Sequence, residues 1–377
     1  MSGRFLRLAC TAAVAAQAVL VPAPVHAAPS APGPERPVAE LLTDLQQRYR
    51  QVEQATETYN ATQERLERQR TEVDRLDDEL ARSRLSLHTS KAAAGRLARQ
   101  QYQSATGLSP YLRLLLARDP QHALDEGHVI GQLARERAET VGRLAGDEKK
   151  HAELTRRART ALDARLALAA RQKQQRDEVR ARLSDVERML AALTPAQLTA
   201  VTGLERTGEA DAQRRLTTSG ALGTSTPPPS QAGDRAVRYA VEQLGKPYQW
   251  GTAGPLSYDC SGLTQQAWDH AGTPIPRTSQ EQWAHLPHIP LAELRPGDLV
   301  VYFPKATHVA LYLGDGKVVQ APRPGARVKI SPIAANPILG AVRPDPAAGS
   351  LARYTPPKLP PAAAQGPDEG YSPAPNL

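Results

Sequence analysis

Cysteines, aromatic residues and long hydrophobic runs are scarce in this 377-residue sequence. Aromatic residues make up 4% of the chain, and all three tryptophans lie after residue 249, so we expect a large hydrophobic core only in the C-terminal part. After the first residues, no stretch approaches the ~20 apolar residues that a membrane-spanning helix needs. The sequence therefore predicts a soluble protein with one core-forming domain.

The first residues have the layout of a secretory signal peptide. Two arginines precede an apolar run over residues 8–21, and small residues end the segment at Ala27. Because two prolines follow the run and it is short for a bilayer span, we expect cleavage after Ala27 rather than a permanent anchor. Residues 1–27 are therefore predicted to direct secretion to the cell exterior or cell wall.

The formal net charge of +8 does not by itself predict a nucleic-acid-binding protein. The chain has no compact basic motif, and much of the excess lies in arginine-rich helical sequence, where a solvated charged face is the ordinary explanation. Export argues against nucleic acid as well. The charge is compatible with weak, salt-sensitive attraction to an anionic cell-wall polymer.

Removal of residues 1–27 would leave Cys260 as the one cysteine of the mature chain. A secreted protein with a single cysteine forms no internal disulfide, and an idle exposed thiol would oxidise. Three interpretations remain, which are a buried inert thiol, an intermolecular bridge and a reactive nucleophile. The surroundings of Cys260 discriminate among them.

Residues 37–216 are predicted to form a long coiled-coil helical hairpin. One heptad position stays apolar through nine repeats without a proline, which predicts a helix over about residues 38–101. These residues are Val38, Leu45, Val52, Tyr59, Leu66, Val73, Leu80, Leu87 and Ala94. The companion position is partly polar, which suggests an exchangeable packing partner. After a break at 106–110, a second helix is expected over about 124–193 and a short third one over 195–216.

The tip of this hairpin is expected at residues 110–124. A leucine- and tyrosine-rich patch occupies residues 111–116. An exposed apolar cluster at a tip is a candidate docking surface. The alternative is that the patch folds back and caps the hairpin, and the sequence favours neither.

Composition marks the remaining boundaries. Residues 217–231 are rich in threonine, serine, glycine and proline, which predicts a linker. Residues 345–377 are rich in proline and alanine, which predicts a disordered tail. The compact domain is therefore expected at residues 232–344.

Cys260 is predicted to lie in the first turn of a helix. An apolar pattern after it marks an amphipathic helix over about residues 260–271. The free N–H groups and partial positive charge of a helix N-terminus stabilise a thiolate, so we expect the pKa of the thiol to be lowered. An inert structural thiol needs no such position, so a nucleophile is the favoured interpretation.

A nucleophilic cysteine needs a base, and His308 is the best-placed candidate. Strands are predicted over residues 299–303 and 308–313, and among nine histidines only His308 leads into a clear strand. A strand holds its side chains firmly, as a catalytic base requires. The alternative is a structural or merely exposed histidine.

Gln320 is a candidate to orient the imidazole, depending on the turn that precedes it. A two-residue turn would pair Gln320 with Leu311 and direct it away from His308. A three-residue turn over 314–316 would pair it with Ala310 and place it on the face of His308. In that case Gln320 could accept from the imidazole N–H as the third member of a triad. Otherwise it is a glutamine at the rim.

Five ordered segments resemble the motifs of the NlpC/P60 peptidases. They are Pro247-Tyr248-Gln249-Trp250-Gly251, Asp259-Cys260-Ser261-Gly262-Leu263, Pro276-Arg277-Thr278-Ser279-Gln280, Pro296-Gly297-Asp298-Leu299 and His308-Val309-Ala310-Leu311-Tyr312-Leu313-Gly314. The N-terminal helices also resemble those of secreted actinobacterial cell-wall hydrolases of this family. The resemblance implies a papain-like α+β domain behind a coiled-coil hairpin. It further implies cleavage of peptidoglycan stem peptides, commonly between D-glutamate, through its γ-carboxyl, and the diamino acid.

The resemblance also implies roles for single residues. Cys260 is the expected nucleophile and His308 the expected base, with no cofactor and no metal. The third catalytic position is often histidine in the family and is Gln320 here, which can orient an imidazole but carries no charge. Four residues match positions near the nucleophile or in contact with the substrate peptide: Tyr248, Asp259, Ser261 and Ser279.

The leading prediction is a thiol peptidase that cuts peptidoglycan stem peptides. The same residues would serve an amidase that cuts between glycan and stem peptide, because the thiol chemistry is shared. A third interpretation makes the C-terminal domain a silent wall-binding module, and the intact Cys260, His308 and Ser261 argue against it. The coiled coil is expected either to occlude the Cys260 cleft or to dock on a membrane-bound division or wall-remodelling complex.

Overall fold

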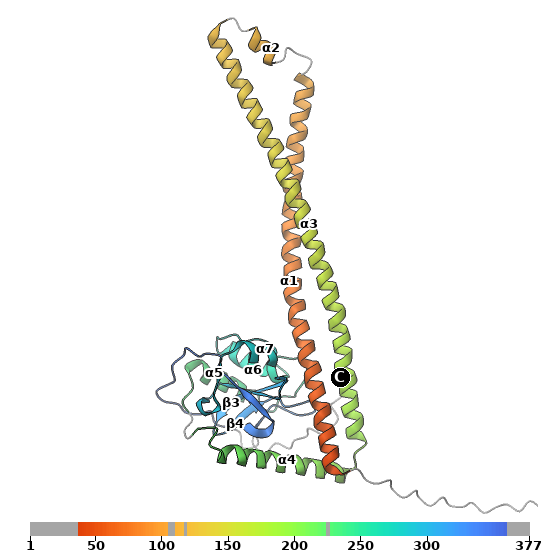
Figure 1. Cartoon of the computed structure of the whole chain (residues 1–377), viewed down its shortest axis with the longest axis vertical. Helices are drawn as coiled ribbons and strands as arrows, with labels where there is room; N and C mark the ends of the chain where they lie inside the picture. The colour runs from red at the N-terminus through yellow and green to blue at the C-terminus, as the bar shows by residue number, and fades with distance from the viewer. Residues whose placement is uncertain (1–36, 105–109, 117–118, 224–226, 360–377) are drawn as a thin grey trace, which may run out of the picture. The chain divides into compact units, whose positions relative to one another are not determined.

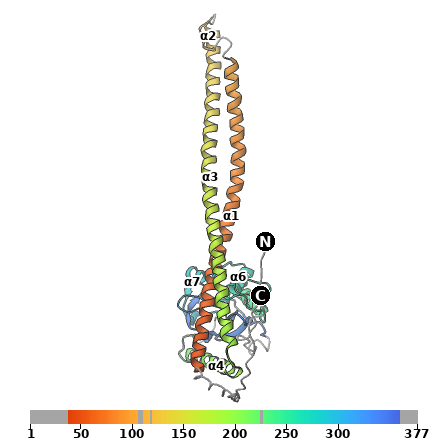
Figure 2. The same ribbon diagram turned by 90° about the vertical axis from the view of Figure 1, so that its right-hand side faces the viewer.

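The computed structural model describes residues 37–104, 110–116, 119–223 and 227–359. The expected signal peptide and most of the expected tail lie outside these residues. Three α-helices make up the hairpin, α1 (Val38–Ser104), α2 (Pro110–Leu115) and α3 (Pro120–Ala191). Figure 1 and Figure 2 show α1 and α3 lying alongside each other, with α2 at the far end. In the described part of the chain, no helix combines the length and apolar character needed to cross a bilayer.

Helices α1 and α3 run antiparallel and bury the predicted apolar stripe. Arg182 donates to Gln51 at 2.8 Å, and Gln69 donates to the backbone carbonyl of Ala161 at 3.0 Å, so advancing along one helix means going back along the other. The stripe is buried at most of its positions as far as Leu80, about twelve turns from the start of α1, and becomes half-buried toward the tip. Its fully buried members are Leu45, Val52, Leu66, Val73 and Leu80.

Helix α4 (Pro195–Thr218) connects the hairpin to the C-terminal domain. It begins with a capping box, in which Thr194 and Gln197 exchange side-chain to backbone hydrogen bonds. Val201 near its start packs into the core of the hairpin, and Leu216 near its end packs against the sheet of the C-terminal domain. One rigid helix therefore touches both parts, as Figure 1 shows.

The C-terminal domain is an α+β fold with a six-stranded antiparallel sheet. Its helices are α5 (Gln231–Glu242), α6 (Cys260–His270) and α7 (Ser279–His285), with 3-10 turns η1 (Leu291–Glu293) and η2 (Ile333–Ala335). Its strands are β1 (His288–Ile289), β2 (Leu299–Tyr302), β3 (His308–Gly314), β4 (Lys317–Gln320), β5 (Lys329–Pro332) and β6 (Ile338–Val342). The strand order in the sheet is β1-β6-β2-β3-β4-β5.

Both faces of this sheet are covered, so its central strands are apolar on both sides. Leu299, Val309 and Leu311 pack under α5 and α6 in the main core. Val300 and Tyr312 point the other way and pack with side chains of α4 and the loop that follows it. Helix α6 and the strand that bears His308 are thereby fixed against each other.

The ends of the C-terminal domain differ from the boundaries expected from composition. Ser230, in the expected linker, caps α5 by accepting from the N–H of Gly233 at 2.8 Å. In the expected tail, Asp345 forms an ion pair with Arg295 at 2.8 Å, and the N–H of Leu351 donates to a backbone carbonyl at 2.8 Å. These specific polar contacts hold segments whose composition alone indicated no structure.

Candidate active site

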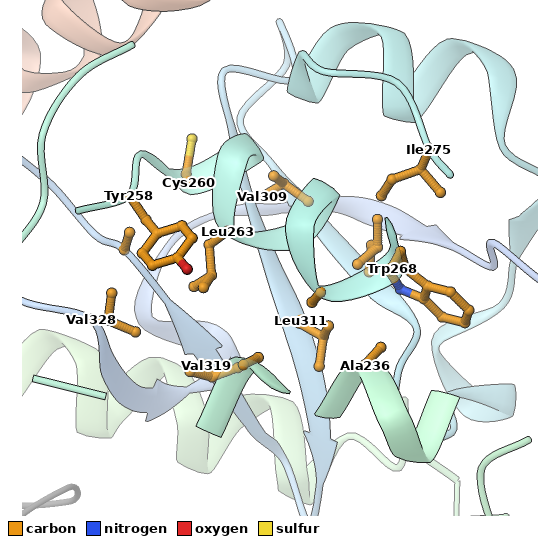
Figure 3. Close-up of a cluster of buried hydrophobic side chains, with 14 of the residues drawn as sticks. Ala236, Tyr258, Cys260, Leu263, Trp268, Ile275, Val309, Leu311, Val319 and Val328 are labelled. Carbon is orange, nitrogen blue, oxygen red and sulfur yellow. The ribbon is translucent and has the colours of Figure 1, made fainter. Parts of the chain in front are cut away.

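The thiol of Cys260 lies at the first residue of α6, as the sequence predicted. Asp259 is the N-cap and its Oδ1 accepts from the N–H of Gly262 at 2.7 Å, which ends the preceding loop and starts the helix at Cys260. Figure 3 shows the side chain pointing away from the hydrophobic residues under α6. Only 3% of Cys260 is exposed, however, because another part of the chain covers it.

His308 begins β3, and Gln320 ends the neighbouring strand on the same face. Leu311 lies opposite Val319, so Gln320 follows the register that the sequence analysis linked to a three-residue turn. Its Oε1 lies 2.7 Å from His308 Nε2, and both side chains are buried. Gln320 Nε2 donates in turn to Ser331 Oγ at 2.8 Å.

The turn itself differs from the expectation. Gly314 pairs with Lys317, so Asp315 and Gly316 form a two-residue turn, with φ of 50° and 66°. A register shift between Tyr312 and Gly314 then adds one residue to β3. This bulge restores the pairing that directs Gln320 toward His308, and a turn assigned from sequence alone could not reveal it.

A buried ion pair organises the start of α6, and its basic member, Arg277, was not predicted as a site residue. Arg277 contacts Asp259 through both terminal nitrogens, at 3.0 and 2.6 Å. It also donates to Ser261 Oγ at 2.9 Å. Arg277 is 8% exposed and Asp259 is fully buried. The Asp259 carboxylate thus caps α6 and holds the guanidinium of Arg277, which in turn binds the hydroxyl of Ser261.

Glu57 of α1 occupies the centre of the site. Its carboxylate accepts from Ser261 Oγ at 2.8 Å and from the backbone N–H of Ser279 at 2.7 Å, and it lies 3.0 Å from Ser279 Oγ. Its Oε1 lies 4.0 Å from Cys260 Sγ. Glu57 is 1% exposed. Two residues expected to contact substrate therefore bind a side chain of their own chain.

Two neighbours of Glu57 on α1 contact other residues of the site. One turn before it, Glu53 Oε1 lies 3.4 Å from His308 Nδ1. One turn after it, Asn60 donates to Asp259 Oδ2 at 3.1 Å. Because Glu53 and Glu57 are four residues apart, they lie on one face of α1, and His308 and Cys260 face consecutive turns of that helix.

Contacts outside the site hold α1 in this position. Tyr59 packs edge-on against Trp250, with ring centroids 5.2 Å apart. Glu205 of α4 binds Arg323 through both carboxylate oxygens, at 2.6 and 3.0 Å, and that guanidinium lies over the ring of Tyr49, 5.2 Å from its centroid. These contacts attach both α1 and α4 to the C-terminal domain.

The electrostatics around the thiol are opposite to the sequence expectation. Burial raises the pKa of Cys260 well above its ordinary value, and the carboxylates of Glu57, Asp259 and Glu53 raise it further. The backbone N–H of Val309 acts in the opposite direction and is outweighed. The predicted lowering of the pKa is wrong for this conformation, because burial of the thiol, and after it the three nearby carboxylates, disfavours the thiolate.

The same burial shifts two of the other ionisable groups. Burial raises the pKa of Glu57 from 4.5 to about 7, and Asp259 contributes to the rise, while Arg277 and the hydrogen bonds from Ser261 and Ser279 oppose it. Burial alone would lower the pKa of His308, but Glu53 and the hydrogen bond to Gln320 outweigh it, so that pKa is raised. The arrangement thus favours a protonated thiol beside an imidazolium that faces a carboxylate.

Tyr248, the remaining residue expected near the nucleophile, is buried beside it. It is 7% exposed, and its backbone N–H donates to the carbonyl of Ala326 at 2.9 Å. Burial raises the pKa of Tyr248, and the charge of Cys260 contributes to the rise. The structure therefore brings all seven predicted residues to one place.

Three residues of α1 that contact the site were not predicted from the sequence. Glu53, Glu57 and Asn60 recur at i, i+4 and i+7, which marks a polar face beside the apolar stripe. Such a face is ordinarily solvated. These three side chains are buried only because the C-terminal domain packs onto this face of α1, and the sequence of α1 alone does not indicate that contact.

A cysteine at the start of a helix, packed on an antiparallel sheet beside a strand-borne histidine, places the C-terminal domain in the papain-like α+β class. Residues 245–340 match the model of the NlpC/P60 family, and this domain belongs to that family. The match begins just before the Tyr248 motif and ends within β6.

Several curated proteins resemble this chain. A probable endopeptidase of Corynebacterium glutamicum is 43% identical over 94 residues, which cover 25% of this chain and 45% of that protein. A probable endopeptidase of Mycobacterium tuberculosis is 29% identical over 352 residues, 81% of this chain and 90% of that protein, so the similarity extends beyond the NlpC/P60 domain. The peptidoglycan endopeptidase RipB of M. tuberculosis is 34% identical over 145 residues, 35% of this chain and 60% of that protein. The chain spans less than half the length of the C. glutamicum relative.

Proposed function

We propose that the C-terminal domain hydrolyses peptide bonds in peptidoglycan stem peptides through the thiol of Cys260. The observation that carries the proposal is that Cys260 and His308 face consecutive turns on one side of α1, with Gln320 bonded to the far nitrogen of the imidazole. The names of the relatives, which are endopeptidases and a peptidoglycan endopeptidase, agree with it.

The proposed reaction begins when His308 Nδ1 takes the proton of the Cys260 thiol. The thiolate attacks the carbonyl carbon, and the backbone N–H of Cys260 donates to the oxyanion that forms. The C–N bond then breaks as Nδ1–H gives its proton to the leaving amine, which leaves a thioester. Water attacks the thioester, its proton passes to Nδ1, and the carboxylic acid leaves while the thiol re-forms.

The position of Glu57 favours a bond next to a free carboxylate. Ser261 Oγ and the N–H of Ser279 both donate to the Glu57 carboxylate, and one oxygen of this carboxylate lies 4.0 Å from the Cys260 sulfur. The same two donors could bind a free carboxylate of the substrate at this position. A glutamate linked through its γ-carboxyl carries a free α-carboxylate close to the bond that follows it. We therefore assign the γ-D-glutamyl–diamino acid bond as substrate. An amidase substrate carries no free carboxylate next to its scissile bond.

In the proposed resting state, α1 inhibits the enzyme. Cys260 is 3% exposed and His308 is fully buried, so a peptide cannot reach them while α1 is in place. The raised pKa of Cys260 keeps the thiol protonated, and Glu53 faces the nitrogen that would take its proton. Steric exclusion and electrostatics act together, which suits an enzyme whose unrestrained action on the wall would endanger its own cell.

The proposal gives the hairpin a second role in relieving this inhibition. Leucines at its far end are well exposed, among them Leu115 at 80% and Leu124 at 74%. An exposed apolar cluster of this kind fits a docking surface. The partner would be a membrane-bound division or wall-remodelling complex, and residues 1–27 would export the chain to the cell wall where both the partner and the peptidoglycan lie.

Analysis of released wall fragments tests this proposal. The full chain carrying Glu57→Ala, which removes the central inhibitory contact, is incubated with purified peptidoglycan, and the products are identified by mass spectrometry. New N-termini at the diamino acid are expected, together with stem fragments that end in D-glutamate. The same chain with Cys260→Ala is the matched control and should release none.

Three outcomes would contradict the proposal. Intact stem peptides with a free L-alanine N-terminus would identify an amidase. Equal release by the Cys260→Ala variant would mean that the thiol performs no chemistry. Tight wall binding without any product would indicate a silent binding module.

A further inference from the structure

A cavity with a volume of about 630 Å³ lies between α1, α4 and the C-terminal domain. Sites that bind small molecules typically have volumes of about 300–1,000 Å³, so this one can hold part of a peptide. Glu53 and Gln320 both line it, and they face the two ring nitrogens of His308 at 3.4 and 2.7 Å. The cavity therefore reaches the imidazole of His308.

The proposed reaction brings the leaving half of the substrate to this cavity. His308 gives its proton to the leaving amine, so that amine lies at the imidazole when the C–N bond breaks. The acyl half is on the other side of the bond, at Ser261 and Ser279, and neither serine is among the described walls of the cavity. Glu53 belongs to α1 and withdraws with it. The chain that follows the amine can then enter the cavity from His308.

The two charged walls that the C-terminal domain contributes are both cations, Arg323 and Lys329. Helix α4 adds Glu205, Glu209 and Arg215. Glu205 binds the guanidinium of Arg323 through both carboxylate oxygens, at 2.6 and 3.0 Å. The domain side of the cavity thus offers cationic groups to whatever extends from His308.

Lys329 is directly opposite Gln320 in the sheet. The two residues are paired across β4 and β5, so the side chain of Lys329 leaves the sheet on the face that Gln320 shares with His308. Lys329 is half-buried. Its ammonium is carried on a flexible four-carbon stem and can follow an anionic group that enters the cavity.

The leaving half of a stem peptide is anionic. It begins at an amine of the diamino acid and ends in a main-chain carboxylate, and a diamino acid with a carboxylate on its side chain supplies a second one. We propose that this cavity is the subsite for the leaving half and that the ammonium of Lys329 binds one of these carboxylates. The inference rests on the proposed peptidase function. It adds a specificity-determining residue on the side of the scissile bond opposite Ser261 and Ser279.

Synthetic stem tripeptides test this assignment in the full chain carrying Glu53→Ala and Glu57→Ala, which removes the two carboxylates of α1 that face His308 and Cys260. One peptide has both carboxylates of the leaving half free, a second is amidated at the main-chain carboxylate, and a third at the side-chain carboxylate. At least one amidation should lower kcat/KM about tenfold, and it identifies the carboxylate that is bound.

Variants of Lys329 connect that loss to its ammonium. Lys329→Gln should lower kcat/KM for the free peptide about tenfold, mainly through KM, and should no longer respond to the amidation that affects the parent. Lys329→Arg keeps the charge and should stay within about threefold of the parent. Lys317→Gln, at the exposed start of β4, is the matched control and should change nothing.

Binding of the free tripeptide to the same chain with Cys260→Ala, followed by calorimetry, needs no catalysis. Lys329→Gln should raise its Kd about tenfold. Equal cleavage of all three peptides by the parent, or a Lys329→Gln variant that keeps the full loss on amidation, would overturn the assignment. A parent chain that is as inert as its Cys260→Ala variant would refute the proposed function instead, and the calorimetric titration would still decide the role of Lys329.

Discussion

Raising the pH from 6 to 8 should release α1 from the catalytic domain. Docked Glu57 has a pKa of about 7, raised from 4.5 chiefly by burial. A raised pKa in the docked state means that the contact is strongest when the carboxyl is protonated and weakens as the pH rises toward 7. The raised pKa of His308 acts with the same sign, since docking also favours the imidazolium.

The size of the effect follows from the two pKa values of Glu57. A difference between 4.5 and about 7 corresponds to ~3 kcal/mol of docking free energy over the whole titration. Between pH 6 and pH 8, Glu57 alone should weaken docking about tenfold. His308 should add to this factor.

Alkylation of Cys260 by iodoacetamide measures the released fraction, in a chain whose other cysteine is removed by Cys10→Ser. The rate is divided by that of a reference chain in which Glu53, Glu57 and Asn60 are all alanine, which cancels the ordinary titration of the thiol. The ratio should rise at least about tenfold from pH 6 to pH 8. Glu57→Gln keeps a neutral side chain of the same shape and should flatten much of this rise.

A ratio that stays constant or falls with pH would refute the reasoning, because it would mean that docked Glu57 is ionised throughout. A Glu57→Gln variant with the full slope of the parent would refute the assignment to Glu57 and leave His308 as the source.

Three further predictions concern single contacts. Asn60→Ala removes the hydrogen bond to Asp259 and should raise the alkylation rate of Cys260 about fivefold, whereas Glu67→Gln, on an exposed part of the same helix, should leave it unchanged. Arg277→Ala leaves the buried carboxylate of Asp259 unpaired and should lower the free energy of unfolding of the C-terminal domain by about 3 kcal/mol in urea titrations, while a loss below 1 kcal/mol would mean that water replaces the guanidinium. Gln320→His supplies another acceptor for His308 Nε2 and should keep kcat of the released enzyme within about tenfold, whereas Gln320→Leu should lower it about a hundredfold in the same fragment-release assay.

The helical hairpin was largely predictable, because apolar residues recur at a regular helical spacing in the sequence. A heptad stripe from Val38 to Ala94 predicted α1, and its end was placed within three residues. The second helix begins at Pro120 rather than near Leu124, because Asp119 caps it and proline is well suited to the first turn. Local signals of this kind need no knowledge of the rest of the fold.

The candidate site was predictable where a residue type and its local setting suffice. Cys260 follows a capping aspartate, and His308 opens a strand, so both could be recognised from neighbouring residues. The orientation of Gln320 was not, because it depends on a bulge in β3 that compensates for a two-residue turn. The two-residue turn shifts the register of β4 by one residue, and the bulge in β3 shifts it back. Only the pairing of the strands in the structure shows this compensation.

The sequence by itself determined the long hairpin, the α+β domain and the residues that could carry thiol chemistry, because each depends on periodicity or on near neighbours. The tertiary structure decided the state of the site. Glu57 and Cys260 are more than two hundred residues apart, and only the packing of α1 onto the domain turns a polar helix face into a buried carboxylate that covers the thiol. The pKa of a group depends on the charges and solvent around it in space, so the same cysteine that the sequence marks as a nucleophile is held protonated in this conformation.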